Sequence, residues 1–375
     1  MKHLLTLTFG LTLSIICYGQ QPIGSKTITT GVPFLNIHND PAGAGMGELG
    51  VVAAPDYYGT ANQMNPALLA RGRTLIGGNV AYSPWLRALG IGDIHLTDVN
   101  FYADLDRIGI GINARRFDLG QLQLTGGLGQ PIGTANPVEQ QISTSVALRI
   151  TDNLSAGVGL QYFESDLSIR MVNPSIQQKV RSIATNMGLY YQDYFTLAEG
   201  IRLRSSWGVS ILDLGPKITY TTTAAARDFI PINLAFGVME GVEYDIDDQF
   251  AIGLDFGFQG QKLMVPSEGG RSDLPLLSGM FGSFTDAPFA EEIRSINWQL
   301  GTEARLTGPS QLLAALRGGV FIETPEFGNR NFATLGGSLG IMGLRLDMAY
   351  IWAGRQPHPL QNTLRMSFGY TFVLD

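Results

Sequence analysis

The sequence predicts an all-β protein, a transmembrane antiparallel β-barrel of about fourteen strands with an N-terminal plug inside it. Three observations support this prediction. Segments in which every second residue is large and apolar return from residue 72 to the C-terminus. The residues between them are mostly Gly, Asn and Gln with an occasional charge, which suits a narrow polar lumen. Short and long connections alternate along the chain, as in bacterial outer-membrane barrels.

The composition argues against several other classes. The 375 residues include 47 Gly, and 15% are charged while 10% are aromatic, which is too apolar for a disordered chain. The sequence contains no run of about 18 apolar residues that could cross a membrane as a helix. The net charge of −7 argues against a nucleic-acid partner, because contact with the phosphate backbone requires a basic surface.

Residues 1–19 are expected to form a secretory signal peptide. MKH supplies a positive start, LLTLTFGLTLSII supplies the apolar region, and CYG supplies a small-x-small cleavage site. Cys17 would also suit lipoprotein processing, but the two bulky isoleucines before it disfavour that route. We therefore expect Cys17 to be removed, which leaves a mature chain without disulfides or thiolate sites.

The closing segment TLRMSFGYTFVLD shows the two-residue period most clearly. Its bulky residues fall on one face and its small or polar residues on the other, because side chains alternate across a strand. A soluble sandwich also alternates, but its outer faces carry residues such as Lys, Glu and Thr. We expect the bulky face to contact lipid and the last strand to pair with the first. An even number of strands would place both termini in the periplasm.

The connections predict two unlike ends of the barrel. Those at 151–153, 244–249, 306–310 and 342–343 are short, whereas those near 117–138, 166–181, 213–228 and 263–292 are long. Short turns belong in the periplasm and long loops outside the cell.

Residues 20–71, called the plug segment below, lack the two-residue period and are rich in Gly, Ala and Pro. Two interpretations of such a segment are a flexible periplasmic leader and a plug inside the lumen. Its apolar side chains favour the plug; they are Met46, Leu49, Val51, Val52, Met64, Leu68 and Leu69. The predicted organisation is a signal peptide at 1–19, the plug segment at 20–71 and the barrel at 72–375.

Ionisable side chains fall on the small, lumen-facing side of several predicted strands. They are Arg115, Asp255, Glu303, Arg305, Arg317, Glu323, Arg345, Asp347 and Arg365. One interpretation is a path for a polar solute. Both signs are interspersed on neighbouring strands, however, which favours internal ion pairs that fill the lumen and contact the plug segment.

The tip of the first hairpin and the long connection near 263–292 predict a surface for a partner or for cargo. The expected contact residues are Trp85, Leu86, Leu276, Leu277, Met280, Phe281, Phe284 and Phe289. Five of them, between residues 276 and 284, have the i, i+1, i+4, i+5, i+8 spacing of one apolar helical face. Exposed apolar patches of this kind mark partner sites. The alternatives are a lid folded over the barrel and, for Trp85, a place in the interfacial aromatic belt.

The sequence offers little for catalysis. His38, His95 and His358 are far apart, and close pairs with metal-ligand spacing do not occur. The glycine run GLGQPIG lacks the Lys and helix of a phosphate-binding loop. We therefore expect no enzyme activity, no cofactor and no metal.

Eight segments occur in an order that resembles a known family: GMGELGVVAAPD, NPALLA, YSPWLRALGIGDI, LDLGPKITY, DFIPINLAFG, QKLMVP, SFTDAPFAEEI and HPLQNTLRMSFGYTF. The resemblance is to the PorV/PorQ family of the Bacteroidota type IX secretion system, whose members have a FadL-like fold. NDPAGAGMG and ANQMNPA depart from the usual family pattern.

This resemblance implies a shuttle subunit rather than an enzyme. It implies docking on the SprA/Sov translocon barrel and capture of the C-terminal signal domains of type IX cargo. It further implies transfer of that cargo to a PorU-type attachment complex, in contact with outer-membrane lipid or lipopolysaccharide. The alternative function is a FadL-like channel for hydrophobic small molecules.

Overall fold

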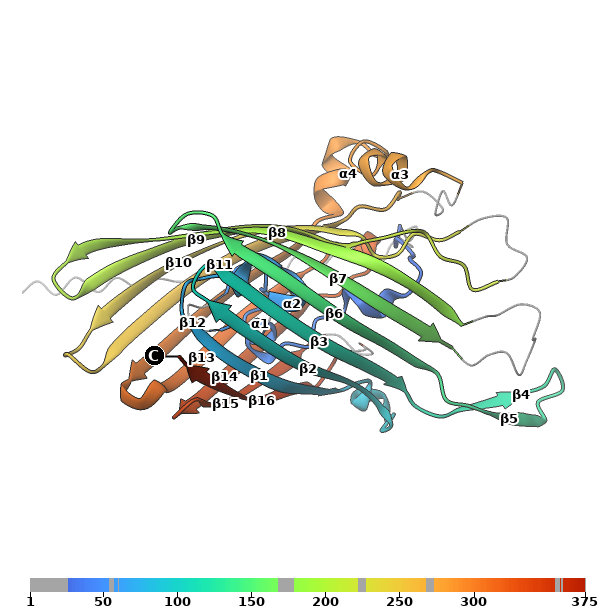
Figure 1. Ribbon diagram of the computed structural model, residues 1–375. Coiled ribbons are helices and arrows are strands. Elements are labelled where there is room, and N and C mark those ends of the chain that lie inside the picture. Colours follow the sequence, from blue (N-terminus) through green and yellow to red (C-terminus); the bar gives the residue numbers. More distant parts are fainter. Residues whose placement is uncertain are drawn as a thin grey trace, which may run out of the picture.

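The computed structural model describes residues 26–53, 57–59, 61–167, 179–221, 227–267, 273–354, 358 and 360–374. Fourteen antiparallel strands close into one barrel (Figure 1), which confirms the predicted fold class. The predicted signal peptide and the first residues of the plug segment lie outside the described residues, and the predicted domain boundaries stay predictions.

The barrel strands follow one another around the wall in chain order. They are β1 (Leu75–Pro84), β2 (Ile94–Leu105), β3 (Ile108–Leu119), β6 (Val138–Arg149), β7 (Leu154–Asp166), β8 (Val180–Ala198), β9 (Ile201–Leu214), β10 (Asn233–Asp245), β11 (Ala251–Leu263), β12 (Asn297–Gly308), β13 (Leu312–Ile322), β14 (Phe332–Ile341), β15 (Leu344–Trp352) and β16 (Thr363–Val373). Two further strands, β4 (Leu122–Thr125) and β5 (Pro131–Ala135), form a separate hairpin inside the long connection predicted near 117–138.

The last strand closes the barrel by pairing with the first. β16 runs antiparallel to β1, with Val373 opposite Leu75 and Met366 opposite Tyr82. The strands contain 9 to 19 residues, and a tilted strand needs about 9–11 residues to cross a bilayer. The long connections lie at one end, called the barrel mouth below, and the short turns lie at the other.

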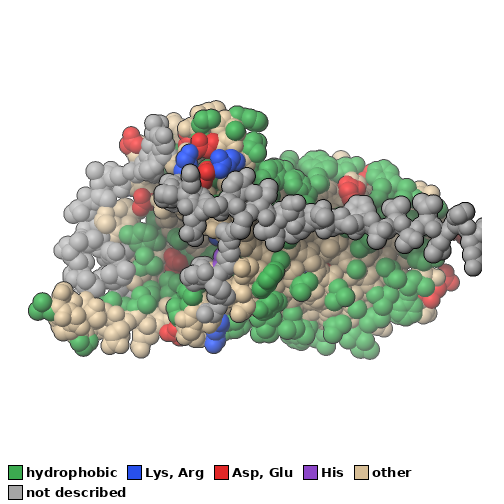
Figure 2. All heavy atoms as spheres, turned by 180° about the vertical axis from the view of Figure 1, so that it is seen from behind, with side chains coloured by type: hydrophobic (Ala, Val, Ile, Leu, Met, Phe, Trp, Pro, Cys, Tyr) green, Lys and Arg blue, Asp and Glu red, His purple; other side chains and the backbone are tan. Residues whose placement is uncertain are grey.

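The two-residue period predicted for the strands is confirmed. In β11, Ile252, Leu254 and Phe256 are exposed while Asp255 between the last two is fully buried. Hydrophobic side chains cover much of the outer wall (Figure 2). The inner face carries Gly, Ser, Asn, Gln and charged side chains. Because water-soluble sheets do not expose continuous apolar walls of this size, the outer face suits lipid.

The plug segment lies inside the barrel (Figure 1) and is almost wholly buried. Its short helices are η1 (Pro33–Asn36), α1 (Pro41–Gly45), α2 (Ala61–Met64) and η2 (Pro66–Leu69). Wall glycines allow its backbone to approach closely. A Cβ on Gly157 would lie 2.5 Å from the carbonyl carbon of Pro66, and a Cβ on Gly319 would collide with the backbone of Met46 and Gly47.

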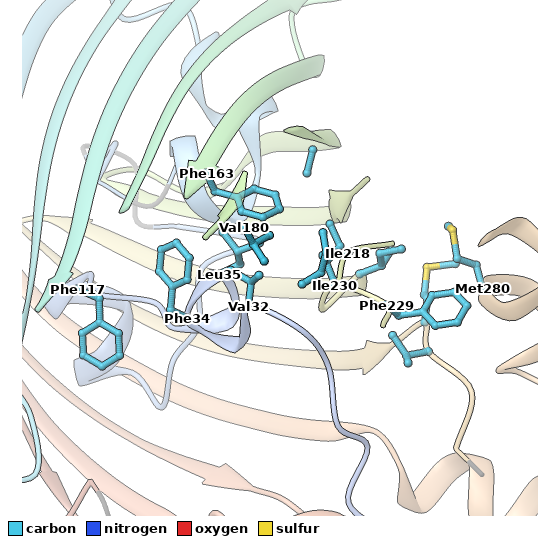
Figure 3. Close-up of a cluster of buried hydrophobic side chains, with 14 of the residues drawn as sticks. Val32, Phe34, Leu35, Phe117, Phe163, Val180, Ile218, Phe229, Ile230 and Met280 are labelled. Carbon is cyan, nitrogen blue, oxygen red and sulfur yellow. The ribbon is translucent and has the colours of Figure 1, made fainter. Parts of the chain in front are cut away.

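The long connections fold over the barrel mouth. Their helices are η3 (Arg87–Leu89), α3 (Leu276–Gly282), α4 (Phe289–Arg294) and η6 (Pro325–Phe327); η5 (Pro309–Gln311) lies in a turn at the opposite end. None of the described helices is long and apolar enough to cross a membrane. A cluster of buried side chains, the mouth cluster, joins plug, wall and connections (Figure 3): it includes Val32, Phe34, Leu35, Phe117, Phe163, Ile218, Phe229, Ile230 and Met280.

Candidate functional site: the plugged lumen and the barrel mouth

An ion-pair network lies on the inner wall of four neighbouring strands, β9, β10, β11 and β12. Arg204 Nη2 lies 2.7 Å from Asp255 Oδ1, and Arg305 pairs with the other oxygen of the same carboxylate. Arg305 also reaches Glu243 at 3.2 Å. Asp255 is fully buried, so its charge depends on these two guanidinium groups for compensation.

A second network lies on β12 to β15. Arg317 donates to Glu303 and lies 3.4 Å from Asp347. Arg345 Nε donates to Asp347 Oδ2 over 2.9 Å. Ser338 also donates to Asp347. Four of the predicted lumen residues therefore form one continuous group of alternating charges.

Two further predicted residues hold other parts of the interior. Arg115 Nε donates to Asp98 Oδ1 over 2.9 Å, and Gln63 of the plug segment donates to the same oxygen over 2.9 Å. Arg365 on β16 lies 2.8 Å from Glu48 of the plug segment. The plug is therefore attached to β2 and to β16, the two strands that flank β1.

Neutral hydrogen bonds attach the plug segment as well. Gln259 Oε1 accepts from the backbone amides of Gly50, at 3.0 Å, and Val51, at 2.9 Å. Thr334 accepts from Gly47 N–H at 3.0 Å and donates to the Gly45 carbonyl at 3.1 Å. The plug backbone thus uses wall side chains in place of water, which is how buried irregular backbone is satisfied.

Sequence analysis missed several of these partners. Asp98, Arg204 and Glu243 lie on strands and pair with predicted residues, and Glu48 lies on the plug segment. The alternation signal was weak for Asp98 and Arg204, because only one neighbour of each, Val99 and Leu203, is apolar. Glu48 had no comparable signal. Glu323, which sequence analysis grouped with the lumen residues, instead pairs with Arg330 at the barrel mouth, 2.7 Å away.

The space left beside the plug is small. A cavity of about 20 Å³ lies between the plug segment and the wall, lined by Met46, Leu49, Met239 and Glu303 among others. This is close to the space of one water molecule. Among the described residues, the paired charges and the plug therefore occupy most of the lumen at this level.

A larger cavity of about 130 Å³ opens at the barrel mouth. Trp85, Phe321 and Phe332 supply apolar walls, and His38 and Arg365 line it from the plug segment and β16. Neither ring nitrogen of His38 has a hydrogen-bond partner among the described residues, although the side chain is buried. The cavity therefore combines aromatic walls with unsatisfied polar groups, as small-molecule sites do.

The structure divides the apolar helical face predicted at 276–284. Met280 is only 3% exposed and packs with Leu276 against the mouth cluster, beside Phe229. Leu277 and Phe281 face away from it and are 61% and 65% exposed. Met280 is therefore covered in the structure, because the helix uses that side to attach itself to the barrel, and its role as a partner contact stays a prediction.

Trp85 and Leu86 also face the protein. Both are half-buried and pack against the mouth cluster. The Trp85 ring lies edge-on to Phe117, with 5.9 Å between ring centroids. The structure therefore places Trp85 neither on a free docking surface nor in the lipid-facing aromatic belt, because the hairpin tip folds back over the plug.

The residues that do face outward form what we call the α3–α4 platform. It consists of Leu277, Phe281, Phe284, Phe289 and Ile293, and Phe289 is 81% exposed. Charged contacts fix the platform to the barrel: Lys262 lies 2.8 Å from Glu292, and Lys217 donates to the carbonyl of Leu274 over 2.9 Å. Burial lowers the pKa of Lys217, and Asp273 and Asp228 oppose that change.

The three histidines are not brought together as a metal site. His38 lines the mouth cavity, His95 is close to Tyr82 on the neighbouring strand, and His358 lies beside Phe332. Within the described ranges, no group of three or more His, Cys, Asp and Glu side chains could hold a metal ion.

Comparisons with known proteins identify one matching family. Residues 20–269, more than half of the chain, match the family model described as type IX secretion system protein PorV. No curated protein matches by sequence. Solved structures that are similar include the CymD monoaromatic hydrocarbon channel, with a TM-score of 0.47, 14% identity and coverage of 89% of this chain and 97% of that one.

A FadL homologue from Pseudomonas aeruginosa has a TM-score of 0.39 and 12% identity, with coverage of 92% and 98% of the two chains. The Pseudomonas putida toluene transporter TodX has a TM-score of 0.39 and 8% identity, with coverage of 88% and 96%. At these TM-scores and identities, none of the three carries an argument about the function of this chain.

Proposed function

We propose, from the premise that the chain belongs to the PorV family of the type IX secretion system, that this outer-membrane barrel acts as a cargo shuttle. It docks on the SprA/Sov translocon and captures the C-terminal signal domain of secreted cargo. It then passes the cargo to the PorU-type attachment complex. In this proposal the barrel mouth faces the cell exterior, both termini lie in the periplasm, and the protein catalyses no reaction.

The observation that carries the proposal is the α3–α4 platform. Phe281 and Phe289 remain exposed on a loop that ion pairs and the mouth cluster hold in one place. Because the loop is anchored, a partner would lose little conformational entropy on binding it. Rigid aromatic anchors above a polar rim are what protein partners use as hot spots.

The filled lumen also favours a shuttle over a conducting channel. The networks around Asp255 and Asp347 join wall strands to one another inside the lumen, and the Arg365–Glu48 pair joins the wall to the plug. Moving a solute past them would require breaking several buried ion pairs, each costing roughly 3–5 kcal/mol.

Deleting the gene tests the shuttle directly. Proteins with the type IX C-terminal domain should fail to reach the cell surface, and a very large barrel should copurify with the wild-type protein in mild detergent. Normal surface delivery of these proteins in the deletion strain would refute the shuttle function.

Point variants test the platform. Phe281→Ser and Phe289→Ser should leave barrel assembly intact but reduce copurification of the translocon. Leu128→Ser is the matched control, because Leu128 is 95% exposed at the tip of the β4–β5 hairpin, which also lies at the barrel mouth. Equal copurification of all three variants would remove the platform from the binding site.

A channel for hydrophobic small molecules is the second candidate. The observation that favours it is the 130 Å³ mouth cavity with its aromatic walls. If deletion leaves protein secretion unchanged and abolishes uptake of a hydrocarbon or lipid, this function replaces the shuttle.

A further inference from the structure

An acidic side chain lies in the middle of the lipid-facing wall. On β10 the outward-facing residues run from Phe236 to Tyr244, and they include Val238, Glu240 and Val242. Glu240 is exposed between two exposed valines. It therefore faces the same environment as the apolar residues of the strand.

The depth of Glu240 follows from the aromatic residues on either side. Phe236, four residues toward the mouth, packs with Phe258 and Trp298 at centroid distances of 6.4 and 6.0 Å. Tyr244, four residues toward the turns, is also exposed. Aromatic girdles mark the two interfaces of a membrane barrel. Glu240 is thus about 13 Å along the strand from each aromatic position, at a rise of about 3.3 Å per residue.

Neighbouring strands extend this polar position into a row. Ser205 on β9 stands opposite Glu240 and donates its hydroxyl hydrogen to Glu240 Oε1 over 2.7 Å. Asp193 on β8 stands opposite Ser205 on its other side. We call Asp193, Ser205 and Glu240 the acidic row; Trp207 on β9 and Phe256 on β11 border it.

Hydrocarbon is a poor environment for the acidic row. A carboxyl group has acceptor sites for several hydrogen bonds, and Glu240 receives one from Ser205. Acyl chains cannot donate the others, so the group loses hydration without full replacement. Polar and ionisable residues inside membranes usually face a partner or a cavity for this reason.

We propose that the acidic row is the intramembrane docking face for a second outer-membrane protein. The partner is a barrel whose own wall presents a Lys or Arg side chain at the same depth, where it donates to Glu240. The inference rests on the proposed function for the identity of that partner, which would be the translocon. It adds the face of the barrel and the chemistry of the contact.

A second copy of this chain does not supply the required donor. The outward-facing cations of the described strands are Arg116, Arg181 and Lys262, all close to the barrel mouth. Each is already paired with a carboxylate of its own chain: Asp118, Glu164 and Glu292. Two acidic rows facing one another would repel, so charge complementarity selects a different protein.

Photo-cross-linking in intact cells tests the docking face. A photoreactive amino acid replaces Val238, beside Glu240, or Leu335 on β14, which is exposed on a distant part of the wall. We expect the probe at Val238, and not the probe at Leu335, to cross-link to another outer-membrane barrel. Adding Glu240→Leu should abolish that product, whereas Glu240→Gln, which still accepts a hydrogen bond, should retain most of it.

Three outcomes would overturn the inference: the probe at Val238 forms no protein adduct, it cross-links only to a second copy of this chain, or its product is unaffected by Glu240→Leu. A loss of the product could also reflect misfolding, so thermal unfolding of the purified variant in detergent is measured too. We expect Glu240→Leu to keep or raise the melting temperature, because it removes a carboxyl group from an apolar wall. A lower melting temperature would assign Glu240 to the fold and overturn the docking face.

The two proposals fail separately. If deletion of the gene leaves cargo delivery intact, the shuttle function is wrong, whatever the probe at Val238 captures. If cargo delivery depends on the protein but the probe captures no barrel, only the acidic row is wrong.

Discussion

Arg365 on the last strand and Glu48 in the plug segment form a buried ion pair, with 2.8 Å between Nη1 and Oε1. The two residues are 317 positions apart in the chain, since 365 − 48 = 317. β16 closes the barrel against β1, so this pair ties the plug to the strand at the closure. This ion pair therefore couples closure of the barrel to the binding of the plug segment inside it.

Arg365→Met should destabilise the folded barrel by roughly 3–5 kcal/mol, because it leaves the Glu48 carboxylate buried without its partner. Thermal or denaturant unfolding in detergent measures this change. The double variant Arg365→Met/Glu48→Met should recover much of the loss. A single variant as stable as the wild type would show that the pair contributes nothing to holding the plug.

Gly319→Ala should loosen the plug segment, because the new Cβ collides with the backbone of Met46 and Gly47. Overpacking of this kind costs about 1–3 kcal/mol. Limited proteolysis of the plug segment reads out the effect. Gly318→Ala is the matched control, since a Cβ at Gly318 meets nothing within 4 Å. Equal protection of the plug in both variants would contradict close packing of the plug against Gly319.

Leu346→Arg should impair barrel assembly, because Leu346 is 40% exposed on the outer wall of β15. An Arg near the middle of a barrel's lipid face costs roughly 2–4 kcal/mol. The folded fraction is measured by the heat-dependent shift in gel mobility. Leu277→Arg, on the α3–α4 platform, should assemble normally. Normal assembly of Leu346→Arg would place that face in water.

Lowering the pH should destabilise the folded structure of the barrel mouth around His358. Burial lowers the pKa of His358 below its usual 6.5, and its Nδ1 accepts a hydrogen bond from the Leu360 amide at 3.1 Å. The unfolded state therefore binds a proton at a higher pH than the folded state. The contribution of His358 to stability is present above about pH 6.5 and is lost as the pH falls below that value. Unfolding curves recorded between about pH 7.5 and 5, a range that brackets the ordinary pKa of His, should show this loss of stability. His358→Gln should reduce the pH dependence.

Part of the site was predictable from alternation. Leu254, Phe256 and Asp255 were assigned to the correct faces, because a strand offers its residues only two directions. The α3 helix shows a feature that the sequence pattern did not predict. Its apolar residues were taken as one face, yet Met280 packs inward and Phe281 points outward, because which side of a helix is buried depends on what lies beneath it.

The acidic row could be identified only from the tertiary structure. Glu240 is one charged residue in a strand, and its sequence context does not reveal that Ser205 and Asp193 stand beside it. Register between strands fixes those neighbours.

The amino-acid order alone determined that this chain forms strands with one bulky and one small face, and that these are joined by alternating short and long connections. A period of two residues is a local property, so it can be seen without knowing any contact. Only the tertiary structure decided which cation meets which carboxylate, which glycines the plug presses against, and which side of α3 stays free. Those choices depend on barrel closure and strand register, which bring together residues hundreds of positions apart.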